Sequence, residues 1–130
     1  MRVVIDTNEL VSALWSRNNR LAQIIELVIS GVAVPCDIVE IIREYQEVLS
    51  RPKLAFRFAR ADVSEIIERI KSDGICVVVR PSSEPFVDES DRVFHDVAKA
   101  CEAILITGNE KHYPNEPFVM SPAAFLDSIE

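Results

Sequence analysis

Two short polar segments directly follow runs of β-branched residues, which are typical of buried strands. They are Asp6-Thr7-Asn8 and Thr107-Gly108-Asn109-Glu110. In open parallel sheets, ligands bind outside the carboxyl ends of the strands, so both segments are candidates for a site. An uncompensated charge at the exit of a buried strand costs several kcal/mol. The charge of Asp6 therefore needs compensation. Asp6 or Asn8 could cap the next helix, a bound cation could offset the charge of Asp6, or both could apply.

Helix geometry selects one of three glutamates in the segment Ile38–Ser50 as a second candidate. Successive residues of a helix are about 100° apart, and the apolar residues of this segment then form one stripe. Glu40 and Glu47 point away from that stripe, whereas Glu44 lies closer to its edge. Glu44 could reach from a sheet-facing helix into a pocket. The alternative is a solvated glutamate on the helix surface.

Asp91 and Asn109 are the remaining candidates. Asp91 ends the acidic run Asp88-Glu89-Ser90-Asp91, which precedes a predicted helix. Asp91 or Ser90 could simply cap that helix, since acidic residues are favourable at a helix start. The side-chain oxygen of Asn109 could help to hold a metal-bound water, although Thr-Gly-Asn is equally ordinary in a turn.

Carboxylate oxygens, an amide oxygen and waters are ligands that Mg²⁺ and Mn²⁺ prefer, whereas zinc favours His and Cys. Such a cation would lower the pKa of a bound water and stabilise charge on a phosphoryl group. A site filled by such a cation could accept phosphate. Thr7, Asn8 and Thr107 would support the carboxylates or bind phosphate. His95, on a core-packed helix, and His112, assigned to packing in a turn rather than to substrate, are not expected to act as general bases.

The elements that must position these residues alternate between strands and helices, which is the pattern of parallel βαβ construction. We predict strands at Arg2–Asp6, Val32–Pro35, Ile75–Val79, Ala103–Thr107 and Pro117–Val119. We predict helices at Glu9–Trp15, Leu21–Ser30, Ile38–Ser50, Ala61–Ser72 and Arg92–Cys101. A last helix is expected after Ser121, which can cap it, with Pro122 at its first position.

Size and composition indicate a single α/β domain over residues 1–130. A chain of 130 residues with 48% hydrophobic residues can bury a substantial core. Its net charge of -7 argues against a protein that coats nucleic acid electrostatically. A nuclease is not excluded, because acidic residues that converge on a pocket would be relieved by bound cations, and a cation-filled pocket accepts phosphate.

The cysteines and the N-terminus suggest a cytoplasmic protein. Cys36, Cys76 and Cys101 are odd in number and form no C-x-x-C pair, so we expect buried, reduced packing residues. The chain reaches Asp6 before any apolar stretch long enough for a signal peptide or membrane span has formed.

Five short motifs occur in an order that resembles the PIN-domain family, in particular the branch of toxins in toxin–antitoxin systems. The resemblance covers nearly the whole chain. It is carried by V-V-I-D-T-N-x-L-V-S-A-L from Val3, E-Y-x-E-V-L-S-R-P-K from Glu44, D-E-S-D-R-V-F-x-D-V-A-K-A from Asp88, I-L-I-T-G-N-x-K-H-Y-P from Ile104 and S-P-A-A-F-L from Ser121.

The resemblance implies a three-layer α/β/α sandwich with a central parallel sheet of four to five strands. It also implies a metal-dependent ribonuclease that acts as a toxin on single-stranded or structured RNA, with a protein antitoxin and a homodimeric state. The matching acidic positions are Asp6, Glu44 and Asp91. The fourth position, usually Asp, is Asn109, which puts a second metal and full activity in question.

One further departure from the family pattern is Glu9, which stands where relatives usually have an apolar residue. Glu110 or Asp88 could supply the carboxylate that Asn109 lacks. The segment Arg51–Arg60 mixes cations with aromatic residues and could contact RNA, or could pack its phenylalanines inward.

The first of two rival functions is a catalytically weakened PIN-like binding or regulatory module. The second, a phosphoacceptor receiver domain, is disfavoured because residues 117–121 hold no Lys.

Overall fold

A computed structural model describes residues 1–15, 20–52, 60–76, 79–83 and 85–129. Its strands are β1 (Arg2–Ile5), β2 (Val34–Asp37), β3 (Ile75–Cys76), β4 (Ile104–Ile106) and β5 (Val119–Met120). Its α-helices are α1 (Thr7–Trp15), α2 (Arg20–Ile29), α3 (Val39–Leu49), α5 (Arg60–Asp73), α6 (Arg92–Cys101) and α7 (Pro122–Ser128). Two 3₁₀-helices, η1 (Glu89–Asp91) and η2 (Glu110–His112), complete the described elements.

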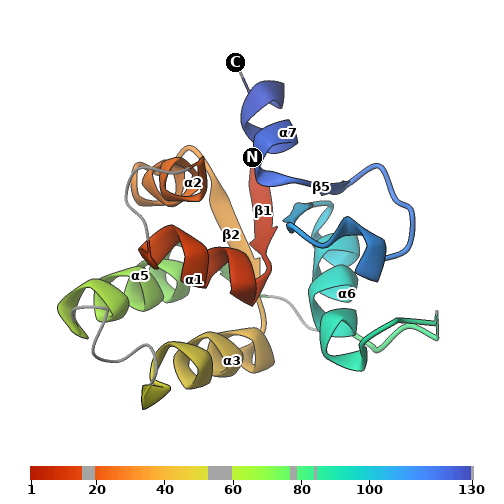
Figure 1. Ribbon diagram of the computed structural model, residues 1–130, viewed down its shortest axis with the longest axis horizontal. Coiled ribbons are helices and arrows are strands. Elements are labelled where there is room, and N and C mark those ends of the chain that lie inside the picture. The colour runs from red at the N-terminus through yellow and green to blue at the C-terminus, as the bar shows by residue number, and fades with distance from the viewer. Residues whose placement is uncertain (16–19, 53–59, 77–78, 84, 130) are drawn as a thin grey trace.

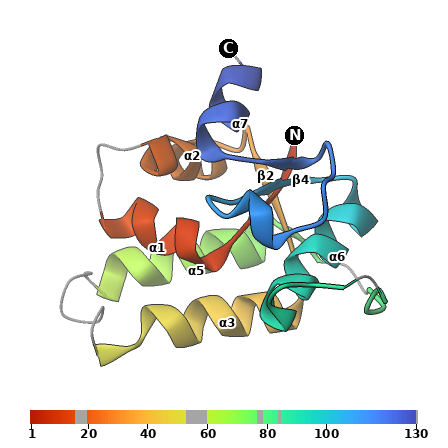
Figure 2. The same cartoon turned by 45° about the vertical axis from the view of Figure 1, so that its right-hand side comes forward.

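The five strands form one sheet in the order β3-β2-β1-β4-β5, and every pair is parallel. Helix α6 covers one face of the sheet, and α1, α2 and α5 lie on the other (Figure 1). Helix α3 runs beside the end at which β1 and β2 finish, as both views indicate (Figures 1 and 2). The predicted three-layer sandwich with a parallel sheet is therefore confirmed.

The two central strands bring the predicted polar segments together. In the register of β1 with β4, Val4 lies opposite Leu105 and Ile5 opposite Ile106. The ladder continues for one more bond, because the backbone N–H of Asp6 donates to the carbonyl of Ile106 (3.1 Å). The segments that follow β1 and β4 consequently start side by side at the same edge of the sheet.

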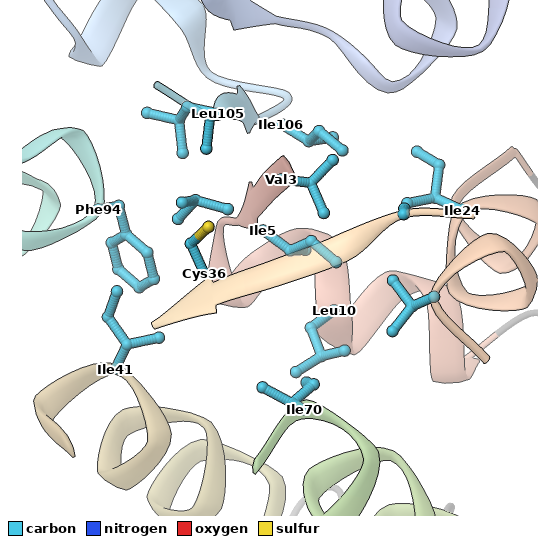
Figure 3. Close-up of a cluster of buried hydrophobic side chains, with 14 of the residues drawn as sticks. Val3, Ile5, Leu10, Ile24, Cys36, Ile41, Ile70, Phe94, Leu105 and Ile106 are labelled. Carbon is cyan, nitrogen blue, oxygen red and sulfur yellow. The ribbon is translucent and has the colours of Figure 1, made fainter. Parts of the chain in front are cut away.

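The hydrophobic core fixes this edge on both sides of the sheet. Phe94 of α6 and Ile41 of α3 pack on the side of Cys36, whereas Leu10 and Ile24 pack on the other side (Figure 3). All of these side chains are buried. The apolar strands predicted from the sequence are thus central, and the helices meet them through the faces that periodicity indicated.

Several predicted boundaries were wrong by one or two residues, and two of the shifts have clear physical causes. The strand expected from Val32 begins only at Val34, because Gly31 ends α2 in the left-handed region (φ 83°) and the N–H of Ala33 still donates to the carbonyl of Leu27. Helix α1 begins before Glu9, at Thr7, since the carbonyl of Asp6 already accepts its first hydrogen bonds.

Other predictions about elements have different outcomes. The predicted cap of α7 is confirmed, because the Ser121 hydroxyl oxygen accepts a hydrogen bond from the Ala124 N–H (3.1 Å) and Pro122 opens the helix. The strand expected to run to Val79 is described only over Ile75–Cys76, since residues 77–78 lie outside the described part. Within the described residues, no helix is long and apolar enough to cross a bilayer.

Candidate functional site

Asp6 is the centre of a hydrogen-bond network at the carboxyl edge of the sheet. Its side chain is only 5% exposed. One carboxylate oxygen accepts a hydrogen bond from the Asn8 N–H (3.2 Å), and the other accepts from the hydroxyls of Thr107 (3.0 Å) and Tyr113 (3.1 Å). Asp6 is thus the residue that caps α1, while Asn8 lies within the helix. The carboxylate also joins the start of α1 to the distant segment that follows β4.

A second threonine links Glu44 to the segment that follows β1. The hydroxyl of Thr7 donates to Oε2 of Glu44, which links the start of α1 to α3. Glu44 is half-buried, whereas Glu40 and Glu47 are exposed and Glu47 forms an ion pair with Arg51 (2.9 Å). The helix geometry that selected Glu44 therefore agrees with its position, although its role as a ligand remains a prediction.

Asp91 comes from the other side of the sheet, where η1 runs into α6. Its carboxylate makes no capping hydrogen bond at the start of α6, whereas Asp88 caps η1 by accepting from the N–H (3.0 Å) and the hydroxyl (2.8 Å) of Ser90. Burial raises the pKa of Asp91, and the negative charges of Asp6 and Asp88 raise it further. His112, 3.5 Å away, opposes this effect. The carboxylate of Asp91 therefore lies within the field of Asp6.

Two buried tyrosines lie within the field of the acidic residues at this edge of the sheet. Burial raises the pKa of Tyr113, and the charges of Asp6, Asp91 and Glu44 raise it further. Burial likewise raises the pKa of Tyr45, whose hydroxyl donates to the carbonyl of Ile5, and the charges of Asp6, Asp37 and Glu44 raise it further. Sequence reasoning missed both hydroxyls, because each bonds a residue at least 40 positions away.

Glu9 is a fourth carboxylate at this edge of the sheet. It lies on the first turn of α1 and is only 7% exposed. Its Oε1 accepts a hydrogen bond from the backbone N–H of Gly108, in the turn after β4. Burial raises the pKa of Glu9, the bond from Gly108 lowers it, and the charge of Asp6 raises it. Glu9 and Ala13 lie one helical turn apart on the same face of α1, and both are buried.

The turn after β4 also places Asn109 and Glu110. The N–H of Asn109 donates to the Thr107 hydroxyl oxygen (3.0 Å), so this threonine connects the turn to Asp6. The side chains of Asn109 and Glu110 are both exposed, and Asp88 is exposed and engaged in its cap. Glu110 or Asp88 was expected to replace the carboxylate that Asn109 lacks. Buried Glu9 has more structural support as the source of that negative charge than either of them.

The donor set fits a hard divalent cation by its chemistry, since it offers carboxylate and amide oxygens. The cysteines whose side chains are described, Cys36 and Cys101, are free and buried, as expected. His95 is wholly buried on α6, as expected of a core residue. Among the described residues, no three Asp, Glu, His or Cys side chains are arranged so that they could hold an ion together. The carboxylates therefore converge without forming a complete metal cage.

Three other features concern the surroundings of the site. The strongly buried Asp37 at the end of β2 was not predicted; burial raises its pKa to about 6. Most of the segment Arg51–Arg60 lies outside the described residues, as does the side chain of Trp15. For the segment Arg51–Arg60, both contact with RNA and inward packing of its phenylalanines remain predictions.

The chain thus combines a parallel α/β sandwich with buried acidic side chains at the carboxyl edge of its central strands. The sequence profile of the PIN domain matches residues 2–111, and the chain therefore belongs to the PIN domain family. Members of this family are usually metal-dependent ribonucleases. A comparison with curated proteins found no match.

Proposed function

We propose that this chain is a cytoplasmic endoribonuclease that depends on Mg²⁺ or Mn²⁺ and hydrolyses phosphodiester bonds in single-stranded or structured RNA. The observation that carries the proposal is the hydrogen-bond network of a PIN domain in which Asp6 accepts from Thr107 and Tyr113, and Thr7 donates to Glu44, with Asp91 near enough for its charge to act on Tyr113. Carboxylates gathered in this way repel one another, and a bound cation would relieve the repulsion.

Each residue of the proposed site has a separate role. Asp6 would be the central ligand, and Glu44 and Asp91 would complete the ligand set or orient the attacking water, with the amide oxygen of Asn109 beside them. Thr107 and Thr7 hold the carboxylates of Asp6 and Glu44 by hydrogen bonds, and Asn8 does so through its backbone N–H. When bound, the cation supplies Lewis-acid chemistry to the water and to the phosphodiester.

A role as the toxin of a toxin–antitoxin pair is a further part of the proposal. It is supported by membership of the PIN domain family and by the motifs shared with its toxin branch. The partner would be a protein antitoxin that blocks the acidic pocket, and the resting state would be a homodimer. Expression of the chain alone should stop growth, and co-expression of a small neighbouring reading frame should restore it. Growth arrest that the Asp6→Asn variant still causes would contradict a toxic nuclease activity.

The proposed activity can be tested with purified protein, generic single-stranded RNA and Mg²⁺ or Mn²⁺. We expect metal-dependent cleavage by the wild type and a loss of at least about 100-fold in Asp6→Asn, since this substitution keeps the shape but removes the central charge. Glu44→Gln and Asp91→Asn should also lose cleavage. Glu40→Gln is the matched control for Glu44→Gln, because Glu40 is exposed on the same helix. Cleavage that survives Asp6→Asn would place the active site elsewhere.

The second candidate function is a PIN-like module that binds RNA or a protein without efficient cleavage. Asn109 favours it, because the position that is usually acidic carries a neutral amide. The same experiment separates the two functions. Wild-type protein that binds Mn²⁺ and RNA but leaves the RNA intact would establish the binding module and refute the nuclease.

A further inference from the structure

Glu9 occupies an unusual position for an acidic side chain. It is almost fully buried, and among the described residues no Lys or Arg forms an ion pair with it. A buried carboxylate of this kind costs free energy unless hydrogen bonds or a cation compensate it. The hydrogen bond from the Gly108 N–H supplies part of the compensation. The buried carboxylate of Glu9 therefore lowers the stability of the folded protein, and a neutral side chain at the same position would avoid this cost.

The turn after β4 is shaped around the carboxylate of Glu9. A Cβ atom on Gly108 would lie only 2.8 Å from Oε1 of Glu9, so the absence of a side chain at residue 108 makes room for this oxygen. Glu9 thus sits against the residue that directly precedes Asn109. The same turn is tied to Asp6, because Thr107 donates to Asp6 and accepts from the N–H of Asn109.

We infer that Glu9 supplies the negative charge that Asn109 does not, so that the acidic pocket has four carboxylates, with the fourth coming from α1 instead of from the turn after β4. This inference rests on the proposed metal-dependent function. Glu9 acts as a positioning residue: it holds the turn through Gly108 and strengthens the negative field around Asp6, which attracts the cation. Burial raises the pKa of Glu9, and the charge of Asp6 raises it further, so the two carboxylates act on each other electrostatically.

The test separates the charge of Glu9 from its hydrogen bond. Glu9→Gln keeps the size of the side chain and an oxygen that can accept from the Gly108 N–H, but it removes the charge. Mn²⁺ binding is measured by titration calorimetry without RNA, and thermal unfolding is measured with and without Mn²⁺. We expect Glu9→Gln to weaken Mn²⁺ binding about tenfold. We also expect it to raise the melting temperature of the metal-free protein and to reduce the rise that Mn²⁺ causes.

A second substitution tests whether the two positions are interchangeable. Asn109→Asp in the Glu9→Gln background should recover most of the lost affinity, because it returns one carboxylate to the same turn. A residue that only fastened the turn would not be rescued by a charge at residue 109. Glu26→Gln, an exposed glutamate on α2, is the matched control and should leave Mn²⁺ binding unchanged. Glu110→Gln tests the rival carboxylate.

The outcomes distinguish this inference from the proposed function. Mn²⁺ binding by Glu9→Gln that equals wild-type binding would overturn the inference and leave the metal-dependent function intact. Loss of binding in Glu110→Gln but not in Glu9→Gln would assign the fourth charge to Glu110 and would equally overturn it. Wild-type protein that binds no Mn²⁺ at all would overturn the metal-dependent function itself, and the inference with it.

Discussion

Asp37 allows a quantitative prediction about the stability of this domain. It is 6% exposed at the end of β2, and a Cβ on Gly74 would lie 2.9 Å from its Oδ2, so the residue after α5 packs closely on the carboxylate. Burial raises the pKa of Asp37 from its ordinary value of 3.8 to about 6. A difference of one in pKa corresponds to about 1.36 kcal/mol, so the ionised carboxylate should cost the folded protein about 3 kcal/mol.

The direction of the pH effect follows from the raised pKa. The folded protein holds the proton of Asp37 more tightly than the unfolded chain does, so folding is least penalised below pH 3.8. The penalty develops as the pH rises from 3.8 and is complete above about 6. Asp37→Asn removes the charge while keeping the shape. We therefore expect this variant to be about 3 kcal/mol more stable than wild type at pH 7.5 and less than about 1 kcal/mol more stable at pH 4.

Urea unfolding followed by far-ultraviolet circular dichroism, in metal-free buffer at several pH values, measures this difference directly. Asp127→Asn is the matched control, since Asp127 is exposed on α7, and it should change stability little at either pH. A gain for Asp37→Asn that is equal at pH 4 and pH 7.5 would mean that asparagine simply packs better. A loss at pH 7.5 would show that the ionised carboxylate has a stabilising partner, and either result would refute the reasoning.

Three further predictions concern the network around the site. Tyr113→Phe removes a hydroxyl that donates to Asp6, and we expect RNA cleavage to fall about fivefold with little change in RNA affinity, measured by single-turnover kinetics. Gly108→Ala should destabilise the domain by about 0.5–1.5 kcal/mol, because its Cβ would displace the Oε1 end of Glu9 and weaken the hydrogen bond from the Gly108 N–H; urea unfolding should show that Glu9→Ala relieves most of this loss. His95 is fully buried, and its ring nitrogens have no hydrogen-bond partner among the described residues, but they lie 3.7 Å from Asp96 and 3.8 Å from Glu116. We expect His95→Phe to leave the melting temperature unchanged or raise it; a lower melting temperature would show that these carboxylates stabilise the ring.

The fold could be predicted from local patterns because its central elements are strongly apolar and periodic. Val3, Val4 and Leu105 are fully or almost fully buried, as expected of central parallel strands, and α6 has the predicted bounds Arg92–Cys101. Errors occurred where backbone geometry, not hydrophobicity, sets a boundary. The left-handed turn at Gly31 that delays β2 is an example.

The candidate site was less accessible to sequence reasoning, since its contacts join distant residues. Asp6 followed from its position after a strand, and Glu44 from the helical stripe together with family resemblance. The hydroxyl of Tyr113 reaches Asp6 across 107 positions, and Gly108 reaches Glu9 across 99. No periodicity in a single segment encodes such pairs, because they depend on how the turns after β1 and β4 meet.

The hydrogen-bond donors around the acidic side chains explain how an acidic protein could bind a cation and then an anionic substrate. Hydroxyl and backbone N–H groups hold Asp6, Glu9 and Glu44 in the described part of the chain, and none of the three forms an ion pair with Lys or Arg there. Neutral donors fix a carboxylate without cancelling its charge. A cationic partner would fix it equally well but would leave less attraction for a metal ion. The arrangement therefore preserves the negative charge of these carboxylates, and a bound divalent cation would make this edge of the sheet receptive to phosphate.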